Sequence, residues 1–185
     1  YKKVQEILET GKLRAANNVR KNNKINAVDV LGKVVAIGPV KAKELVEKHK
    51  INTIEELRKN QNLINDKQKI GLKYYEDLLV KIPRSEIDKH NTLLKKITDE
   101  ISSDINFSIV GSYRRGVKNS GDIDVLITHK QDKNIFKKYV DKLIEKGYLT
   151  DNLSYGNKKY SGICKIGNNK YRRIDILFTT QAEYP

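Results

Sequence analysis

The stretch Ile109–Thr128, IVGSYRRGVKNSGDIDVLIT, decides the fold of the chain. It begins as an apolar run, breaks at Gly111-Ser112, and resumes as a second apolar run that contains Asp122 and Asp124. This order predicts a strand, a turn and a second strand. Because side chains alternate across a strand, the two aspartates are expected on one face of the second strand. The opposite, core-facing side then holds Ile123, Val125 and Ile127.

Two carboxylates at this spacing repel each other unless a cation lies between them. A hard divalent ion with oxygen ligands, Mg²⁺ in the first place, is the partner that this pattern favours. The Gly111-Ser112 turn offers backbone N–H groups at the expected start of a short helix, and Arg115 follows closely. Such a turn suits phosphate oxygens, so both halves together indicate a triphosphate site. The alternative is a polar strand edge after an ordinary Gly-Asp turn.

The central stretch contains two motifs at a fixed spacing, Gly111-Ser112-Tyr113-Arg114-Arg115-Gly116 and Ser120-Gly121-Asp122-Ile123-Asp124. This pair resembles the palm motif of the family X DNA polymerases, the group of DNA polymerase beta. The resemblance extends over nearly the whole chain, to Ile37-Gly38-Pro39, Ile82-Pro83-Arg84 and Arg172-Arg173-Ile174-Asp175-Ile176.

The resemblance implies an α+β fold in which a helical helix-hairpin-helix DNA-binding domain precedes a nucleotidyltransferase palm with a mixed sheet and flanking helices. The expected boundaries are 1–13 for the end of an amino-terminal lyase-like domain, 14–82 for the helix-hairpin-helix (fingers) domain and 83–185 for the palm. The thumb of the family would begin after Pro185, and we expect the sequence to be a fragment of a longer protein.

Composition constrains the partners. A chain of 185 residues can form one large domain or two small ones, and its net charge of +14 favours a polyanionic partner. Nucleic acid is favoured over membrane, because no apolar stretch approaches the roughly 20 residues that a membrane span needs. A solvated, lysine-rich surface is the alternative reading of the charge. The single cysteine, Cys164, is expected to be buried. Such low cysteine usage favours a reducing, intracellular compartment: the nucleus if the source is eukaryotic, otherwise cytoplasm or virion.

Hydrophobic spacing predicts the elements outside the central stretch. In the amino-terminal half, a basic helix is expected at 13–20, a polar connector at 22–26, a short helix at 51–58 with Thr53 as its cap, and one helix at 68–79. Tyr74 and Tyr75 of the last helix are expected to pack in the core, and stacking on bases is the alternative. In the second half, helices are expected from 84 or 85 to 101 and at 134–147, and strands at 149–155, 160–166 and 171–179.

The segment from Val34 to Val46 resembles a helix-hairpin-helix, in which a first short helix ends at Ile37-Gly38 and Pro39 lies in the first turn of a second helix. Backbone amides there can face one DNA phosphate without reading bases, which gives a candidate DNA-binding set of Gly38, Pro39, Val40 and Lys41. A plain helical turn is the alternative. The resemblance also implies a monovalent cation, Na⁺ or K⁺, held by backbone carbonyls of Gly32, Val34 and Ile37. The family often has Gly where Ala36 stands.

The resemblance implies a role for each catalytic candidate. Asp122 and Asp124 would bridge two Mg²⁺ ions, and Asp175 would bind the catalytic ion and orient, or take the proton of, the primer 3′-hydroxyl. Arg173 would lie beside Asp175; a salt bridge between these two is the alternative explanation of a carboxylate in so apolar a strand. The phosphates of the incoming nucleotide would be held by Gly111, Ser112, Arg115, Gly121 and Arg84.

The expected function is therefore that of a monomeric DNA-directed DNA polymerase acting on gapped or nicked DNA and deoxynucleoside triphosphates, in repair of the base excision type. The position of Lys3 matches the Schiff-base lysine of the family's deoxyribose phosphate lyase, a possible activity of the full-length parent; a solvated lysine is the alternative. Two other functions stay open: a non-catalytic DNA-binding module, and a nucleotidyltransferase or terminal transferase that uses no template.

Overall fold

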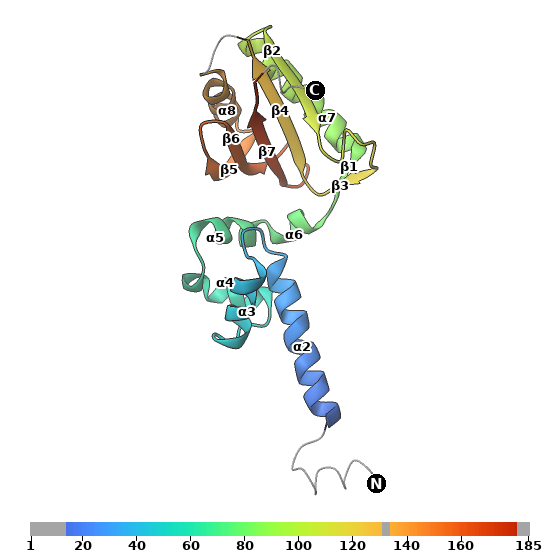
Figure 1. The fold of residues 1–185 in the computed structure, drawn as a ribbon, viewed down its shortest axis with the longest axis vertical. Coiled ribbons are helices and arrows are strands. Elements are labelled where there is room, and N and C mark those ends of the chain that lie inside the picture. The colour runs from blue at the N-terminus through green and yellow to red at the C-terminus, as the bar shows by residue number, and fades with distance from the viewer. Residues whose placement is uncertain (1–13, 131–133, 181–185) are drawn as a thin grey trace, which may run out of the picture. The chain divides into compact units, whose positions relative to one another are not determined.

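A computed structural model describes residues 14–130 and 134–180, with side chains from residue 22 onward. The chain divides between Tyr75 and Glu76 into two compact units. The predicted α+β class is confirmed, since the first unit is helical and the second is built on a mixed five-stranded sheet (Figure 1). Lys3 lies outside the described residues. Across the described ranges, no helix is both long and apolar enough to cross a membrane.

The first unit consists of short helices around a small apolar core. Its elements are α2 (Arg14–Gly32), α3 (Pro39–Glu47), α4 (Ile54–Lys59), the 3₁₀ helix η1 (Gln61–Leu63) and α5 (Asp66–Lys73); α6 (Tyr75–Leu79) starts at the division between the units. Leu31, Leu45 and Leu57 are fully buried at the centre of the core. Each comes from a different helix, so the core joins α2, α3 and α4.

Two helices of this unit differ from the prediction. The expected polar connector at 22–26 is wrong, because α2 continues through it without a break. Asn and Lys side chains at 22–26 are exposed, whereas Ala27 and Leu31, one turn apart, are buried in the core. Burial on this face therefore outweighs the low helix propensity of asparagine.

The single helix expected at 68–79 is also wrong, because it is split at Tyr74 into α5 and α6. Tyr74 leaves helical geometry with φ −106°, and its ring is buried, as predicted. The predicted cap of α4 is confirmed: the Thr53 hydroxyl accepts the backbone N–H of Glu56 at 3.1 Å. A reciprocal capping box between Asn65 and Gln68, which the sequence analysis did not identify, starts α5.

The second unit is a sheet with two long helices. Its elements are β1 (Ile82–Pro83), α7 (Arg84–Ile101), β2 (Ile105–Val110), β3 (Asn119–Ser120), β4 (Ile123–His129), α8 (Ile135–Glu145), β5 (Leu149–Tyr155), β6 (Lys159–Cys164) and β7 (Arg172–Phe178). The main sheet has the order β2-β4-β7-β6-β5, and β1 pairs with β3 in a separate two-stranded sheet. Only β4 and β7 run parallel among the paired strands of the main sheet.

One face of the main sheet packs against the helices, and the other carries the polar side chains. Ile123, Val125 and Ile127 are buried together with apolar residues of α7 and α8, which confirms the predicted core side of β4. The helices α7 and α8 lie along the sheet in Figure 1. The alternation of side chains therefore places Asp124 of β4 and Asp175 of β7 on the face opposite the helices, directly paired across the two strands.

Candidate active site

Three carboxylates converge at the junction of β4 and β7. Each of Asp122, Asp124 and Asp175 contributes an oxygen to a group in which all the oxygens lie within 4.8 Å of one another. Asp124 and Asp175 are neighbours because the two strands pair in parallel register, and Asp122 immediately precedes β4. All three side chains are partly buried. Carboxylate oxygens gathered in this way are the ligands that a hard divalent cation takes.

The electrostatics of the cluster fit such an ion. Burial, and then the carboxylate of Asp175, raises the pKa of Asp122. Burial, and then the charges of Asp122 and Asp175, raises the pKa of Asp124, while Arg173 opposes both increases. Burial and the neighbouring carboxylates therefore both disfavour the charged forms of Asp122 and Asp124. The donor set fits Mg²⁺, because it offers three carboxylate oxygens and a bound cation would reduce the repulsion among them.

Asp175 has two protein partners in addition. The Arg173 Nη2 donates to its Oδ1 at 3.0 Å and to its Oδ2 at 3.3 Å, so the ion pair weighed as an alternative is present beside the cluster. The Ser161 hydroxyl donates to Oδ1 at 2.5 Å from the neighbouring strand β6. Sequence analysis missed Ser161, because the pairing register of β6 with β7 cannot be deduced from the strand pattern alone.

The Gly111-Ser112 segment is not the start of a helix, contrary to the prediction. Residues 111–116 form consecutive turns, in which the Arg115 amide donates to the Gly111 carbonyl at 3.2 Å. Gly111 and Gly116 have φ values of +70° and +81°, which interrupt a right-handed helix. A Cβ on Gly111 would collide with the carboxylate of Asp124, so the turn lies directly against the acidic cluster.

Ser112 and Arg84 are both fixed near this turn. The Ser112 hydroxyl donates to the hydroxyl of the buried Ser120 at 2.7 Å. The Arg84 Nη1 donates to the Tyr113 carbonyl at 2.8 Å, and its guanidinium lies 4.3 Å from the centre of the Tyr113 ring. Tyr113 in turn donates to the carboxylate of Asp88 at 2.6 Å. The turn is thus attached to the first turns of α7.

The remaining predicted phosphate ligands are exposed. Gly121 immediately precedes Asp122. The positive charge of Arg115 lowers the pKa of Asp124, although burial raises that pKa by more. The structure therefore brings the predicted acidic residues and the predicted phosphate-binding turn together in one unit.

The helix-hairpin-helix segment lies in the first unit. Pro39 occupies the first turn of α3 with Gly38 as its N-cap, as predicted. The first helix does not end at Ile37-Gly38; it is α2, which ends at Gly32, and turns follow it. Ala36 adopts φ +70°, a conformation that favours glycine, at the position where the family often has Gly. This strained turn prevents residues 34–37 from forming the predicted helix.

Among the candidate ligands in this segment, Val40 is 84% exposed and Lys41 forms an ion pair with Glu44 at 3.3 Å. The Val34 carbonyl, one of the three proposed for a monovalent cation, accepts the Ile37 amide at 3.0 Å. The loop is also held by Gln68, whose side-chain amide donates to the Ala36 carbonyl at 3.2 Å.

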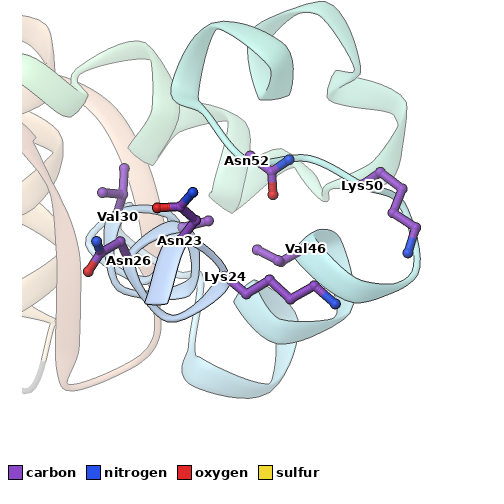
Figure 2. A pocket seen from close by; sticks show the side chains of 8 residues that line it. Asn23, Lys24, Asn26, Val30, Val46, Lys50 and Asn52 are labelled. Atoms are coloured by element: carbon purple, nitrogen blue, oxygen red, sulfur yellow. The ribbon is translucent and has the colours of Figure 1, made fainter. Parts of the chain in front are cut away.

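The first unit also has an open cleft of about 540 Å³, which Figure 2 shows. Amide and ammonium groups surround an apolar base that includes Val30 and Val46. The polar side chains of its lining are Asn23, Lys24, Asn26, Lys50 and Asn52. None of the predicted DNA-binding residues, 38–41, lines this cleft, so it is separate from the helix-hairpin-helix loop.

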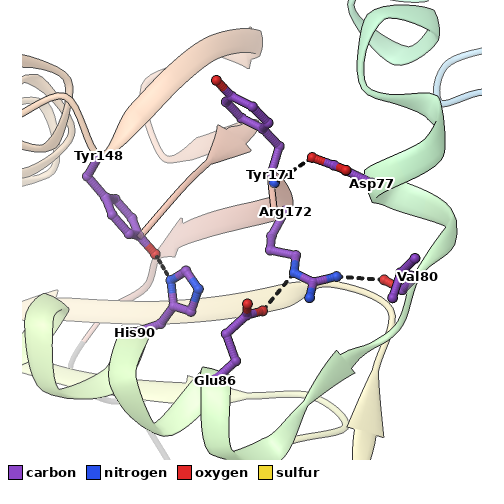
Figure 3. A network of polar contacts seen from close by, with 7 residues as sticks. All are labelled: Asp77, Val80, Glu86, His90, Tyr148, Tyr171 and Arg172. Carbon is purple, nitrogen blue, oxygen red and sulfur yellow. Dashed lines mark hydrogen bonds and ion pairs between the residues drawn. The ribbon is translucent and has the colours of Figure 1, made fainter. Parts of the chain in front are cut away.

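Arg172, next to Arg173 on β7, has a structural role. Figure 3 shows its Nε donating to Glu86 at 2.7 Å and its Nη1 donating to the Val80 carbonyl at 2.7 Å. The adjacent Tyr171 amide donates to Asp77 at 3.1 Å. The residues 77–86 are therefore bonded to the start of the strand that carries Asp175.

His90 and Tyr148 extend the same buried region, with His90 Nδ1 and the Tyr148 hydroxyl 2.7 Å apart (Figure 3). Burial, and then the charge of Arg172, lowers the pKa of His90 to about 4. The imidazole is therefore neutral at physiological pH, as a core residue requires. Cys164 is buried as well, which confirms the prediction, and burial raises the pKa of its thiol to about 12.

Comparisons with known proteins agree with this geometry. The family described as "DNA polymerase beta palm" matches residues 81–181, and the "Fingers domain of DNA polymerase lambda" matches residues 29–79. DNA polymerase lambda of Arabidopsis thaliana is 34% identical over 188 residues, which cover 94% of this chain and 35% of the relative. DNA polymerase lambda of Rattus norvegicus is 29% identical over 192 residues, covering 98% of this chain and 33% of the relative.

A further relative is the human DNA-directed DNA/RNA polymerase mu, 26% identical over 129 residues, which cover 70% of this chain and 26% of that protein. The chain thus spans about a third of the length of the two lambda polymerases. Since the palm match alone covers more than half of the residues and includes all three aspartates, the chain belongs to the family X DNA polymerases and comprises their fingers and palm regions.

Proposed function

We propose that the protein containing this chain is a DNA-directed DNA polymerase that adds deoxynucleotides to a primer 3′-hydroxyl at short gaps, in DNA repair of the base excision type. One observation carries the proposal: the oxygens of Asp122, Asp124 and Asp175 lie within 4.8 Å of one another, directly against the Gly111 turn. The activity is proposed for the full-length protein, because the chain spans about a third of its lambda relatives.

Two Mg²⁺ ions are the cofactors of this proposal. Asp122 and Asp124 would hold both ions, and Asp175 would hold the one nearer the primer end. When bound, such ions neutralise the charge that develops on the attacking and leaving oxygens of an in-line phosphoryl transfer. The raised pKa values of Asp122 and Asp124 support this assignment, because burial and the neighbouring carboxylates disfavour their charged forms and a bound cation would offset both effects.

The protein groups then position the reactants. Asp175 orients the 3′-hydroxyl and accepts its proton, and Arg173 keeps the Asp175 carboxylate in place through its two contacts. The hydroxyl oxygen bonds to the α-phosphorus while the bond to the bridging oxygen breaks, which releases pyrophosphate. Most of the rate acceleration comes from this positioning and from charge neutralisation.

The β and γ phosphates are assigned to the turn that starts at Gly111. Ser112 and Gly121 approach them from the two motifs, and Arg115 and Arg84 supply positive charge. The Arg84 contacts with Tyr113 support this role, because they keep a guanidinium next to the turn.

The fingers region is assigned to DNA. Gly38, Pro39, Val40 and Lys41 bind one phosphate of gapped or nicked DNA through backbone amides at the start of α3. Na⁺ or K⁺ at the carbonyls of Gly32, Val34 and Ile37 would assist. We assign residues 14–82 to this domain and 83–185 to the palm, and we propose a monomer that acts inside the cell.

Single-nucleotide insertion into DNA with a one-nucleotide gap and a 5′-phosphate tests the proposal. The full-length protein in Mg²⁺ is expected to insert the template-matched nucleotide. Asp175→Ala should lower the rate by about 10²–10⁴-fold, the usual contribution of a positioned general base. Asp99→Ala, at an exposed aspartate of α7 that forms an ion pair with Lys95 at 3.8 Å, serves as the control and should keep the wild-type rate.

Three results would contradict the proposal in different ways. Equal rates for Asp175→Ala and wild type would refute the role of Asp175. Insertion that ignores the template would indicate a terminal transferase. DNA binding without any insertion would indicate a non-catalytic DNA-binding module.

A further inference from the structure

Ser161 lies at a position where it can control the Asp175 carboxylate. The antiparallel pairing of β6 with β7 places Ser161 directly opposite Asp175, so both side chains project from the same face of the sheet. The Ser161 hydroxyl donates to Oδ1 at 2.5 Å, the length of a strong charge-assisted hydrogen bond. Both side chains are partly buried, which limits competition from water.

The two oxygens of Asp175 differ in how they are engaged. Oδ1 accepts from Ser161 and also from Arg173 at 3.0 Å, whereas Oδ2 has only the longer Arg173 contact, at 3.3 Å, among the hydrogen bonds of the described residues. Rotation about the last bond of an aspartate has a broad, shallow energy profile, so the plane of a free carboxylate is poorly defined. A donor on each of two strands removes this freedom.

Arg173 alone is a weak determinant of that plane. Its Nη2 bridges both oxygens from the same strand, two residues away, so it restrains the position of the carboxylate group more than its rotation. Ser161 contacts one oxygen from the neighbouring strand and thereby distinguishes Oδ1 from Oδ2. The less engaged Oδ2 retains its capacity to accept a proton or to coordinate a cation.

We propose that Ser161 is a positioning residue: its hydroxyl fixes the Asp175 carboxylate with Oδ1 bound to the protein and Oδ2 directed to the reacting groups. The inference rests on the proposed function, because it assigns Ser161 a part in the same site. Partners of this kind orient metal-binding carboxylates, and their loss typically costs about 10–100-fold in metal affinity or activity.

Two substitutions that are isosteric with each other separate the effect of the hydroxyl from that of side-chain shape. Ser161→Thr keeps the hydroxyl and Ser161→Val replaces it with a methyl group, and both β-branched residues suit a strand. Ser154, the exposed serine paired with Ser161 on β5, provides the matched controls Ser154→Thr and Ser154→Val. Far-UV circular dichroism and thermal unfolding establish that all four variants are folded.

The first readout is Mn²⁺ binding to the 185-residue chain, followed by loss of the electron paramagnetic resonance signal of free Mn²⁺. Ser161→Val is expected to bind Mn²⁺ about 10-fold more weakly than Ser161→Thr, whereas the two Ser154 variants should bind equally. Equal affinities of the Thr and Val variants at 161, or tighter binding by Val, would overturn the proposal.

The second readout is single-nucleotide insertion by the full-length protein. Ser161→Val should lower kcat about 10-fold relative to Ser161→Thr and leave KM for the nucleotide unchanged. If wild type inserts nucleotides but the Thr and Val variants agree in both assays, the role of Ser161 fails and the proposed function stands. If no variant inserts nucleotides but the Mn²⁺ difference is found, the proposed function fails and the positioning of Asp175 by Ser161 stands.

Discussion

At the scale of single residues, the surroundings of Asp124 disfavour its negative charge. Its carboxylate lies against Gly111 and is paired across strands with Val110 on one side and Asp175 on the other. Burial and the neighbouring carboxylates of Asp122 and Asp175 raise its pKa. In the absence of a cation, the ionised form of Asp124 therefore opposes folding.

This raised pKa predicts how stability depends on pH. A carboxyl whose pKa is higher in the folded than in the unfolded protein binds more protons when folded, so its contribution to the free energy of unfolding falls as pH rises toward neutrality. Asp124→Asn removes the charge. At pH 7 and without metal, we expect the variant to unfold at a higher temperature than wild type, by about 2–4 °C for each 1 kcal/mol relieved.

The difference in unfolding temperature between Asp124→Asn and wild type should disappear as the pH falls below about 3.9, because an ordinary aspartate is protonated there. Mg²⁺ should raise the unfolding temperature of wild type more than that of Asp124→Asn, because the variant has lost a ligand. Calorimetry from pH 3 to pH 7, with and without Mg²⁺, measures both effects. If Asp124→Asn is less stable than wild type at every pH, the electrostatic explanation is contradicted.

At the scale of elements, the loop between α2 and α3 shows which features a sequence reveals. Pro39 at the start of α3 was predictable, because proline has a fixed φ and needs no amide partner in the first turn. The end of the preceding helix α2 at Gly32 was not predictable, because the turn that follows it depends on tertiary contacts with α5. Those contacts include the Gln68 hydrogen bond to the Ala36 carbonyl and the close approach of Val35 to Gly71.

Gly71→Ala tests that approach. A Cβ at Gly71 would collide with the backbone carbonyl of Val35, which cannot rotate away as a flexible side chain would. We expect the variant to lose about 1–3 kcal/mol of unfolding free energy, the usual cost of overpacking, although alanine is the better helix former. The loop that contains Ala36 should become less protected from amide hydrogen exchange in the same variant.

Gly32→Ala is the control in the same unit. Its added Cβ would lie 3.9 Å from the Ala42 Cβ, an ordinary contact, and it sits at the end of α2. Urea unfolding should show Gly32→Ala at or slightly above wild-type stability. A Gly71→Ala variant as stable as Gly32→Ala would show that the loop moves without cost and that its packing on α5 is loose.

The acidic site shows the same division between local and long-range information. The pairing of Asp122 with Asp124 on one face of β4 follows from the alternation of side chains, and was predictable. Asp175 could be added only through the family resemblance, since nothing in its own strand says that β7 runs parallel to β4. Ser161 was missed for the same reason, because its role depends on the register between β6 and β7.

At the scale of the whole chain, segments distant in sequence determine where Asp175 lies. Arg172 at the start of β7 bonds to Glu86 of α7 and to the Val80 carbonyl, both more than 80 residues earlier. All these residues lie in the second compact unit, which begins at Glu76. Asp77 and Val80, in the stretch 76–82 that the domain prediction places at the end of the fingers, are thus hydrogen-bonded to Tyr171 and Arg172.

Two glutamates of α7 allow a direct measurement of what this buried ion pair contributes. Glu86 meets Arg172 at 2.7 Å with side-chain exposures of 11% and 4%, and Glu100 meets Lys146 at the same distance with exposures of 39% and 37%. Glu86→Ala leaves a buried guanidinium without its counter-charge, a change that usually costs about 3–5 kcal/mol. Glu100→Ala removes an exposed pair and should change stability little.

Urea unfolding of the two variants compares pairs of equal length in different surroundings. We expect Glu86→Ala to lower the urea midpoint strongly and, because β7 starts at Arg172, to weaken Mn²⁺ binding at Asp175 as well. Glu100→Ala should leave both unchanged. If both variants lose the same small amount of stability, burial does not determine how much the Glu86–Arg172 pair contributes to the free energy of unfolding. The attachment of residues 77–86 to β7 would then depend on the Val80 and Asp77 hydrogen bonds.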